Sequence, residues 1–333
     1  MKLAEAGELH LVDRLKKRFG EESDGRKKPS SLVLGIGDDA AVIRSGRSHI
    51  LLTTDMMVEG VHFDLRWTTM FQLGYKLVSV NVSDIYAMGG MPDHLLLNFA
   101  GPGSLDLLQF DRFFDGLDMA ARKYNLHLIG GDMSSSDKIV LSATVVGSAL
   151  KVIRRCGAKK GDFIHVTGRL GDAAAGLAIM KNLRKQIPLE LNATPKTQLP
   201  WESIEPLIRR HLMPDAVNPE KLLKHATAMM DVSDGLLIDL ERLCKASKTG
   251  ARIWADRLPL SEGMMDASRL LKKSPLDLAL NGGEDYELLF TSSKKVVPGA
   301  TCIGEIQRSG LTVIGPDGKQ MKEKAKGYEH FAL

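Results

Sequence analysis

The chain has 333 residues, of which 44% are hydrophobic, 26% charged and 5% aromatic, and this composition excludes disordered and fibrous proteins. The 45 basic and 41 acidic residues leave a net charge of +4, and the basic residues occur in short, dispersed doublets, which argues against a nucleic-acid partner. Because one hydrophobic core usually stops growing at roughly 250–300 residues, we expect two domains.

The first predicted element is an amphipathic helix from Glu5 to Phe19, where apolar and charged residues alternate with helical spacing. No apolar run in the sequence approaches the ~20 residues of a membrane span, so we expect no membrane association. The cysteines, Cys156, Cys244 and Cys302, are odd in number and far apart. They favour a protein of the reducing cytoplasm, with neither a disulfide framework nor a zinc knuckle.

Apolar, β-rich runs then alternate with helical patterns along the chain, which predicts an α/β or α+β fold. The predicted strands are Leu32–Ile36, Ile50–Leu52, Leu126–Ile129, Ile139–Val146 and Phe163–Val166. The predicted helices are Gly74–Met88, Asp106–Tyr124 and Asp172–Leu183.

Two segments interrupt the alternation of predicted strands and helices. The stretch 149–162 carries glycine and lysine turn signals with little apolar periodicity, and it separates two halves of comparable size. We therefore place a domain boundary near Leu150, which gives domains 1–149 and 150–333. Prolines and an asparagine interrupt the segment 183–201, which predicts a surface loop.

Six aspartates share one setting, at or just beyond an apolar segment and among Gly, Ser or Thr. They are Asp38 in GIGDD, Asp55 in LLTTD, Asp84 in NVSD, Asp132 in IGGD, and Asp231 and Asp234 in MDVSDG. Any one of them is also what an ordinary turn or helix N-cap contains. Together with the hydroxyls of Thr53, Thr54 and Ser233 they form the hard-oxygen set that Mg²⁺ prefers, whereas these turns lack the histidine and cysteine of zinc sites. The repetition predicts a magnesium and phosphate site.

Asp84 is the most informative single carboxylate. It lies inside the apolar, helix-like run LVSVNVSDIYAMGG, where an unpaired buried charge is costly unless a metal compensates it. The alternative is an exposed turn of helix.

The sequence contains neither of the common phosphate-binding loop motifs. The chain has no GxxxxGK[ST] motif, and GIGDDA lacks the spacing and setting of a dinucleotide fingerprint, so neither a P-loop nor a Rossmann site is expected. The turn TGRLGDAAAG leads into a helix whose start either offers backbone N–H groups to an anion or forms a tight strand-to-helix turn. The pair Gly130 and Gly131 before Asp132 presents the same two alternatives.

Two further positions suggest substrate contacts. In LNGGEDYELLF, Glu284 and Asp285 either recognise a cationic or amino-bearing substrate or belong to a charged hairpin. His62, seven residues after Asp55, either reaches a phosphate or is an ordinary surface or capped histidine.

Taken in order, the motifs GIGDDAAVI, TTDMMVEGVHF, NVSDIYAMGG, LIGGD, GAKKGDFIHVTGRLGDAAAGLAI, MDVSDGLLIDL and NGGEDYELLF resemble the thiamine-monophosphate kinase family of the AIR synthetase-like superfamily. The resemblance extends from Gly35 to Phe290. The segments TTD with VEGVHF, together with NGGEDYELL, favour this family over its superfamily relatives.

The resemblance implies the following roles. Several magnesium ions would be held by Asp38, Thr53, Thr54, Asp55, Asp84, Asp132, Asp231 and Asp234, with Asp84 and Asp132 central to catalysis. ATP, as co-substrate, would contact Gly131, Asp132, Arg155 and Ser233, and thiamine monophosphate would contact His62, Glu284 and Tyr328. The resemblance also implies a cytoplasmic homodimer whose N-terminal halves share a β-barrel, with an α/β C-terminal domain flanking the cleft.

Three positions depart from the family pattern: Met133 and Ser134 stand where two threonines are common, and Asn281 where serine is common. Met133 has no hydroxyl to offer a metal-bound phosphate. Among the relatives, selenophosphate synthetase is disfavoured because the first 155 residues contain no cysteine, and hydrogenase maturation proteins because this sequence ends without a cysteine-bearing tail. AIR synthetase and a non-catalytic nucleotide-binding module remain alternatives.

Overall fold

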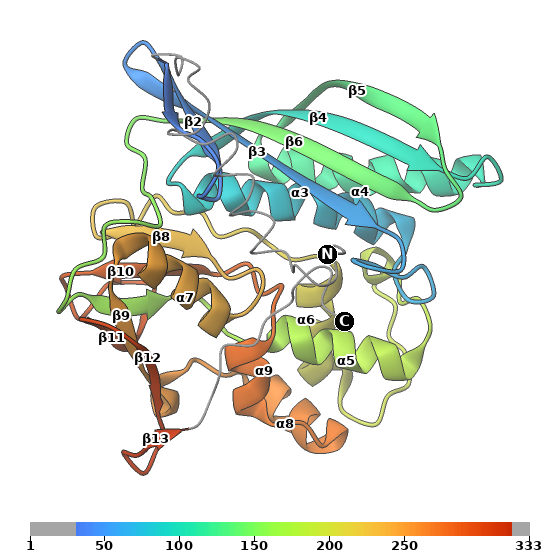
Figure 1. The fold of residues 1–333 in the computed structure, drawn as a ribbon. Helices are drawn as coiled ribbons and strands as arrows, with labels where there is room; N and C mark the ends of the chain where they lie inside the picture. Colours follow the sequence, from blue (N-terminus) through green and yellow to red (C-terminus); the bar gives the residue numbers. More distant parts are fainter. Residues whose placement is uncertain (1–30, 322–333) are drawn as a thin grey trace, which may run out of the picture.

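The computed structural model describes residues 31–321, in which two sheets and their packed helices are seen (Figure 1). The predicted helix from Glu5 to Phe19 and the substrate candidate Tyr328 lie outside these residues. The first half forms a six-stranded sheet in the order β1-β2-β3-β6-β4-β5. Its strands are β1 Leu32–Leu34, β2 Ala41–Ser45, β3 Ser48–Val58, β4 Met91–Gly101, β5 His127–Ser135 and β6 Val140–Ala149.

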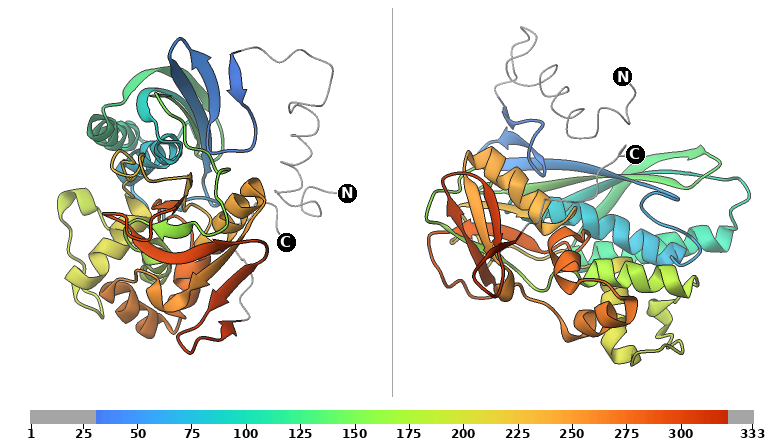
Figure 2. Two further views of the ribbon diagram at one scale, coloured as in Figure 1. Left: turned by 90° about the vertical axis from the view of Figure 1, so that its left-hand side faces the viewer. Right: turned by 60° about the horizontal axis from the view of Figure 1, so that its bottom comes forward.

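Helices α3 Met70–Ala87 and α4 Leu107–Tyr124 cover one face of this sheet (Figures 1 and 2). Burial alternates residue by residue along β6, because neighbouring side chains on a strand point to opposite faces. The two helices pack closely at Gly74, where a Cβ would lie 2.0 Å from the carbonyl oxygen of Phe113. No helix within residues 31–321 covers the opposite face of the sheet (Figure 1).

The second half forms a seven-stranded mixed sheet in the order β13-β12-β9-β11-β7-β10-β8. Its strands are β7 Phe163–Val166, β8 Ala228–Asp231, β9 Gly250–Trp254, β10 Leu288–Ser292, β11 Thr301–Gln307, β12 Leu311–Ile314 and β13 Gln320–Met321. The helices of this half are α5 Asp172–Leu183, α6 Trp201–Leu212, α7 Leu236–Ser247, α8 Glu262–Leu271 and α9 Pro275–Asn281, with single 3₁₀ turns at Leu189–Leu191 and Ala255–Arg257.

Helices of the second half complete the core of the first. Buried residues of α5 and α6, such as Ile179 and Leu207, belong to the same apolar cluster as Leu73 and Leu77 of α3. The side chain of Gln72 also donates a 2.6 Å hydrogen bond to the carbonyl of Ile187 in the loop between α5 and α6. Helix α3 is therefore packed between the first sheet and the helices of the second half.

Most of the predicted elements are confirmed, with shifted ends. β7 and α5 have the predicted bounds, and α4 begins one residue later than predicted. The predicted strand Ile50–Leu52 is part of a much longer β3, because the polar residues TTD continue the strand where the sequence suggested a turn. The predicted strand Leu126–Ile129 continues through Gly130 and Gly131 to Ser135. The segment 183–201 forms a connection with one 3₁₀ turn, as expected of a loop.

The expected two-domain α/β fold is confirmed, whereas a barrel is not formed by the described part of one chain. The first sheet remains open between β1 and β5 within residues 31–321. None of the helices in that range is long and apolar enough to cross a membrane.

Candidate active site

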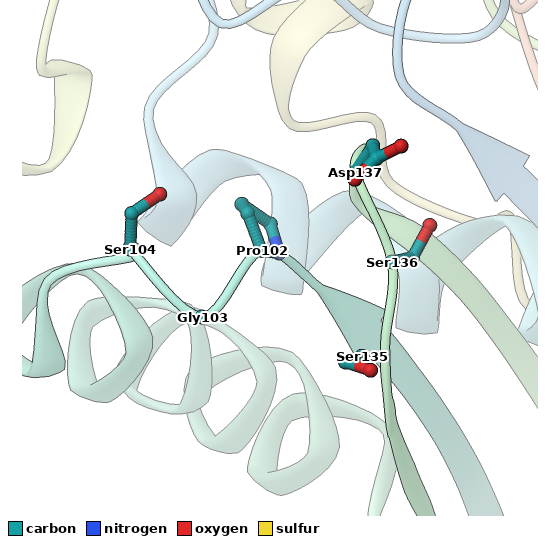
Figure 3. Close-up of a pocket in the computed structure, with 6 residues that line it drawn as sticks. All are labelled: Pro102, Gly103, Ser104, Ser135, Ser136 and Asp137. Carbon is teal, nitrogen blue, oxygen red and sulfur yellow. The ribbon is translucent and has the colours of Figure 1, made fainter.

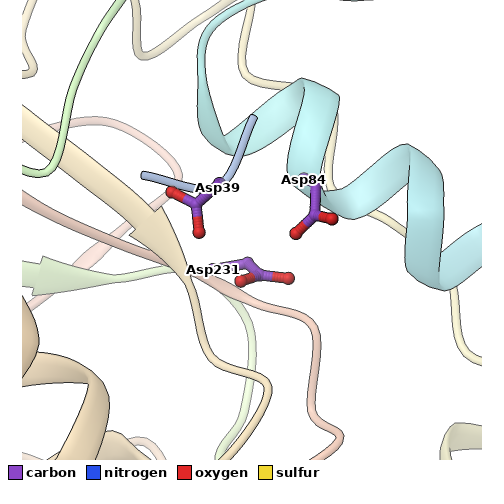
Figure 4. A group of neighbouring side chains, drawn as sticks. All are labelled: Asp39, Asp84 and Asp231. Carbon is purple, nitrogen blue, oxygen red and sulfur yellow. The ribbon is translucent and has the colours of Figure 1, made fainter. Parts of the chain in front are cut away.

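Three carboxylates from distant parts of the chain converge where the two halves meet (Figure 4). Asp39 lies between β1 and β2, Asp84 near the end of α3, and Asp231 at the end of β8. One carboxylate oxygen from each residue lies within 4.8 Å of the other two. These are hard oxygen ligands at a spacing that a divalent cation can bridge.

Hydroxyl groups orient two of these carboxylates. Thr53 Oγ1 donates a 2.6 Å hydrogen bond to Asp84 Oδ2, and Ser83 Oγ donates one of 2.6 Å to Asp231 Oδ2. Every residue of α3 except Asp84 is buried. The alternative of an exposed helix turn is therefore wrong: Asp84 is half-buried, and its carboxylate lies between the two halves.

Burial and mutual repulsion disfavour the ionised form of several of these carboxylates. Burial, followed by the charges of Asp55 and Asp231, raises the pKa of Asp84 well above its ordinary value. Burial and Asp39 raise the pKa of Asp231 in the same way. Burial, Asp234 and Asp39 raise the pKa of Asp55 to about 6. Carboxylates with such perturbed pKa values are what a site for a cation contains before the cation is bound.

Arg155 is the cationic side chain that faces this group from the connection between β6 and β7. Its Nη2 donates a 2.6 Å hydrogen bond to Asp39 Oδ1, and its backbone N–H lies 3.2 Å from both carboxylate oxygens of Asp38. Burial and Asp39 raise the pKa of Asp38 to about 7. Both adjacent acids in GIGDD thus contact Arg155, and Asp39 is the one that belongs to the cluster of three.

Strand β3 presents its site candidates on two faces. Thr53 points toward α3, as its bond to Asp84 shows. Thr54 points to the opposite face, where its hydroxyl donates to the carbonyl of Ala143 and lies 3.2 Å from the hydroxyl of Thr144. The backbone N–H of Asp55 donates to Asn81 of α3, which fixes β3 against that helix.

The turn MDVSDG is fixed by a carboxylate that sequence inspection did not single out. Asp239 of α7 is fully buried, and its Oδ2 accepts hydrogen bonds of 3.1 Å from the backbone N–H groups of Ser233, Asp234 and Gly235. Arg242 pairs with both Asp234 and Asp239, at 2.5 and 2.9 Å. Asp234 is therefore held in place by the first turns of α7.

The glycine-rich turn before α5 is capped in a similar way. The buried Asp285 accepts a 2.6 Å hydrogen bond from the N–H of Gly171 and one of 3.1 Å from that of Ala173. Gly171 has φ +84°, a conformation that glycine adopts without strain. The start of α5 is thus occupied by a carboxylate of the protein, so these N–H groups do not bind an external anion. This confirms the alternative of a tight strand-to-helix turn.

The segment NGGEDYE is a strained, partly buried loop between α9 and β10, so the alternative of a charged hairpin is wrong. Glu284 and Tyr286 have φ values of +68° and +50°, which are uncommon for residues other than glycine. Glu284 pairs with the buried Lys76 of α3 at 2.6 Å and with His211 of α6 at 2.9 Å. Burial alone would raise the pKa of Glu284, but Lys76 and His211 outweigh it and lower the pKa. The loop therefore presents an ionised carboxylate between the two halves.

A separate hollow of about 640 Å³ lies at the far end of β4 and β5 (Figure 3). Small and polar residues line it, including Gly103, Ser104, Ser136 and Asp137. It contains none of the predicted site residues and is not part of the carboxylate site.

Comparison with known proteins decides the family. Models of the AIR synthase related protein match residues 37–149 for its N-terminal domain and 159–328 for its C-terminal domain. The thiamine-monophosphate kinase of Aquifex aeolicus is 36% identical over 99% of this chain and 100% of its own length. That of Salmonella typhimurium is 36% identical over 98% of each chain. The chain belongs to the thiamine-monophosphate kinase family.

Solved structures of the thiamine-monophosphate kinase family agree with this assignment. AaThiL complexed with AMPPCP and TMP matches with a TM-score of 0.83 at 34% identity, over 99% of both chains. A hydrogenase maturation protein from E. coli matches with a TM-score of 0.62 at 18% identity, which shows a shared fold.

The family pattern implies site roles for a set of residues, and the structure brings only some of them together. Asp55, Asp84, Asp231 and Asp234 lie at the junction of the two halves, as their mutual effects on pKa indicate. His62 follows β3, and its Nδ1 accepts a 2.9 Å hydrogen bond from the backbone N–H of Val58.

Gly131 and Asp132 lie elsewhere. They belong to β5, the outer strand of the first sheet, and all nine residues of that strand are exposed. In the sheet register Asp132 stands beside Asn98 of β4. Two strands, β4 and β6, separate it from β3. Within one chain, Asp132 is therefore not a neighbour of the carboxylate cluster.

Several residues that shape the site escaped sequence inspection: Asp39, Lys76, Asp239 and Arg242. Asp39 is adjacent to a predicted ligand, and a second acid in GIGDD was its only signal. Lys76 could have been noticed as a lone cation in an apolar helix, because such a charge needs a buried partner.

Proposed function

We propose that this chain is an ATP-dependent thiamine-monophosphate kinase, which transfers the γ-phosphate of ATP to thiamine monophosphate and releases thiamine diphosphate and ADP. The observation that carries the proposal is the convergence of Asp39, Asp84 and Asp231 in a chain that matches this family over nearly its full length. The related AaThiL, solved with AMPPCP and TMP, supports the choice of both substrates.

The donor set fits magnesium. It consists of carboxylate oxygens within reach of one another, and burial together with the neighbouring acids raises the pKa values of Asp84 and Asp231. Bound Mg²⁺ would supply charge neutralisation between the two phosphorylated substrates. We propose Asp38, Thr53, Thr54, Asp55, Asp84, Asp132, Asp231 and Asp234 as its ligands on the family pattern, and we add Asp39 from its position beside Asp84 and Asp231.

The protein's own groups position the reactants. Arg155 presents a guanidinium beside Asp39, suited to a nucleotide phosphate, and Gly131 and Ser233 are proposed as further nucleotide contacts. Glu284, ionised between Lys76 and His211, is proposed to face the cationic substrate, with His62 and Tyr328 as additional contacts.

The transfer needs no strong base from the protein. A phosphate monoester has a second pKa near ~6, so the acceptor phosphate is largely dianionic at neutral pH. One of its oxygens forms the new bond to the γ-phosphorus as the bond from that phosphorus to the β-phosphate oxygen breaks, and ADP leaves. Asp84 and Asp132 act by binding the magnesium ions that keep the two phosphates in line. No phosphoenzyme forms.

We also propose that the chain is a cytoplasmic homodimer, with domains 1–149 and 150–333 and a β-barrel shared by the two N-terminal domains. The uncovered face and outer strand of the first sheet support this. They expose apolar side chains that a monomer rarely leaves in water: Met56, Met91, Leu96, Leu128, Ile129 and Met133.

The proposed activity is tested by measuring ADP release and product formation with ATP, Mg²⁺ and either thiamine monophosphate, thiamine or buffer. Rapid ADP release and thiamine diphosphate formation with thiamine monophosphate alone are expected. Turnover of the amidine substrate of AIR synthetase instead would favour that relative. Thermal stabilisation by Mg-ATP without ADP release with any thiamine phosphate would favour a non-catalytic module.

A further inference from the structure

The segment that joins β6 to β7 runs from the first sheet to the second (Figure 1). The backbone N–H of Ile153 donates a 3.0 Å hydrogen bond to the carbonyl of Met88 at the end of α3. The carbonyl of Arg154 accepts a hydrogen bond of 3.0 Å from the N–H of Met229 in β8. The segment is therefore fixed between α3 and β8, which supply two acids of the cluster, and the residue that follows is Arg155.

The contacts of Arg155 with the acids depend on how the main chain of this segment runs. Its backbone N–H lies 3.2 Å from both carboxylate oxygens of Asp38, and its Nη2 bonds to Asp39. A different side-chain rotamer cannot replace a contact that the main chain makes. A group that holds the main chain at Arg155 therefore controls how its guanidinium is presented to the site.

One hydroxyl holds the main chain directly at this point. Ser247 Oγ, at the end of α7, donates a 3.1 Å hydrogen bond to the carbonyl of Arg155. It also accepts hydrogen bonds of 3.2 Å from the backbone N–H groups of Gly157 and Ala158. A serine hydroxyl has one donor and two acceptor positions, so its whole hydrogen-bonding capacity serves this segment. These residues lie in neither a helix nor a strand, and the hydroxyl satisfies backbone groups that secondary structure would otherwise pair.

Helix α7 connects this segment to another part of the site. Asp239, near the start of the helix, holds the backbone N–H groups of Ser233 and Asp234, whereas Ser247 is its last residue. At about 1.5 Å per residue, the two anchoring side chains are roughly 12 Å apart along one rigid element. The same helix therefore fixes the MDVSDG turn at one end and the segment with Arg155 at the other.

We propose that Ser247 is a positioning residue for nucleotide binding and that it acts through Arg155. This inference rests on the proposed function, because the contact of Arg155 with a nucleotide phosphate is part of it. Without the hydroxyl, one carbonyl and two N–H groups lose their partner, and the main chain at Arg155 is free to shift. Asp84 and Asp231 keep their own hydroxyl partners, so the loss falls on nucleotide affinity rather than on the transfer step.

The test compares Ser247→Val with Ser247→Thr in the full-length protein. The two side chains have nearly the same shape, and threonine alone keeps a hydroxyl. We expect valine to raise the KM for ATP about 5-fold or more, with kcat within about twofold of wild type, because a binding interaction is lost. Threonine should restore most of the affinity. Calorimetric titration with AMPPCP and Mg²⁺ should show the same order of the three proteins.

Cys156 supplies a readout that a merely structural role would not give. It is exposed and follows Arg155, whereas Cys244 is buried and Cys302 partly buried. In Ser247→Val, Cys156 should react faster with dithiobis-nitrobenzoate than in wild type, with no increase at the other two thiols, as assigned by peptide mass spectrometry. General destabilisation would expose all three cysteines together.

Two controls isolate the hydroxyl and its target. Ser268→Ala removes a buried hydroxyl that donates to the carbonyl of Met265 within α8, and it should leave the KM for ATP and the reactivity of Cys156 unchanged. In an Arg155→Ala background, Ser247→Val should raise the KM for ATP little further, because the contact that Ser247 positions is already absent.

The results that overturn the proposal differ from those that overturn the kinase assignment. An unchanged KM for ATP in Ser247→Val, or equal losses in the valine and threonine variants, would contradict the role of the hydroxyl. Fully additive effects with Arg155→Ala, or faster reaction of all three cysteines, would make Ser247 a purely structural residue. If wild-type protein binds AMPPCP but does not phosphorylate thiamine monophosphate, the kinase assignment fails, and the calorimetric comparison still decides the role of Ser247.

Discussion

Ser83 Oγ donates a 2.6 Å hydrogen bond to Asp231 Oδ2 and so joins α3 in the first half of the chain to the end of β8 in the second. Both groups are buried. The bond fixes one member of the carboxylate cluster from the helix that carries another, Asp84. The geometry of the site therefore depends on how the two halves are packed.

The variant Ser83→Ala tests this dependence. Removing the hydroxyl leaves Asp231 free to rotate, and changes that misorient metal ligands typically cost 10–100-fold in affinity or activity. We expect kcat to fall by about 10-fold or more and the magnesium concentration for half-maximal activity to rise. Ser79→Ala is the control, because Ser79 lies on the same helix but contacts Tyr124. Equal effects of the two variants would contradict the role of Ser83.

The variant Asp84→Asn tests the central carboxylate. The amide keeps the shape of the side chain and removes a half-buried charge that lies among other acids. We expect kcat to fall by about 100-fold or more, while the metal-free melting temperature stays the same or rises because electrostatic repulsion is relieved. Addition of Mg²⁺ should stabilise this variant less than wild type. Near-normal turnover would exclude the metal-binding role.

The raised pKa values predict how stability depends on pH. Without metal, the pKa of Asp38 is about 7 and that of Asp55 about 6, against 3.8 for an ordinary aspartate. From about pH 4 to pH 7 the folded protein thus binds more protons than the unfolded chain, and these groups make the free energy of unfolding fall as the pH rises.

Thermal melts between pH 5 and pH 8 with a chelator check this prediction. The melting temperature should fall less steeply with pH in Asp55→Asn than in wild type. Mg²⁺ should restore stability most at the upper end of the range, because it competes with the protons and binds the deprotonated carboxylates. A stability difference between the two proteins that is independent of pH would contradict the assignment to Asp55.

Asp285 offers a test of the loop that carries Glu284. In Asp285→Ala the N–H groups of Gly171 and Ala173 lose their buried acceptor, which should cost about 2–4 kcal/mol of unfolding free energy, measured by denaturant titration. The KM for thiamine monophosphate should rise, since Glu284 is the next residue. Asp285→Asn keeps an acceptor and should lose less stability. If alanine and asparagine were equally stable, the capping role would be refuted.

The sequence alone predicts the features that depend on the residues next to them in the chain. Asp84 was identified because a charge inside an apolar helical run needs compensation, and α5 was bounded correctly because its apolar spacing starts after a glycine turn. The contacts of the site were not predictable in this way. Asp285 caps a helix 114 residues earlier in the chain, and the choice between Asp38 and Asp39 depends on the conformation of a loop and on Arg155.

The length of β3 was missed for a related reason. The residues TTD are polar and suggest a turn, but tertiary contacts with β6 and α3 keep them extended. The motif containing Asp132 was recognised from its glycines, whereas its position on an outer strand follows from the order of strands in the sheet.

The most direct measurement of the proposed function is ADP release with thiamine monophosphate, thiamine and buffer, followed by chromatography of the thiamine products. The carboxylate site and the family assignment predict stoichiometric ADP and thiamine diphosphate in the first reaction and background release in the other two. Equal ADP release in all three reactions, or phosphorylation of thiamine but not of its monophosphate, would contradict the assignment.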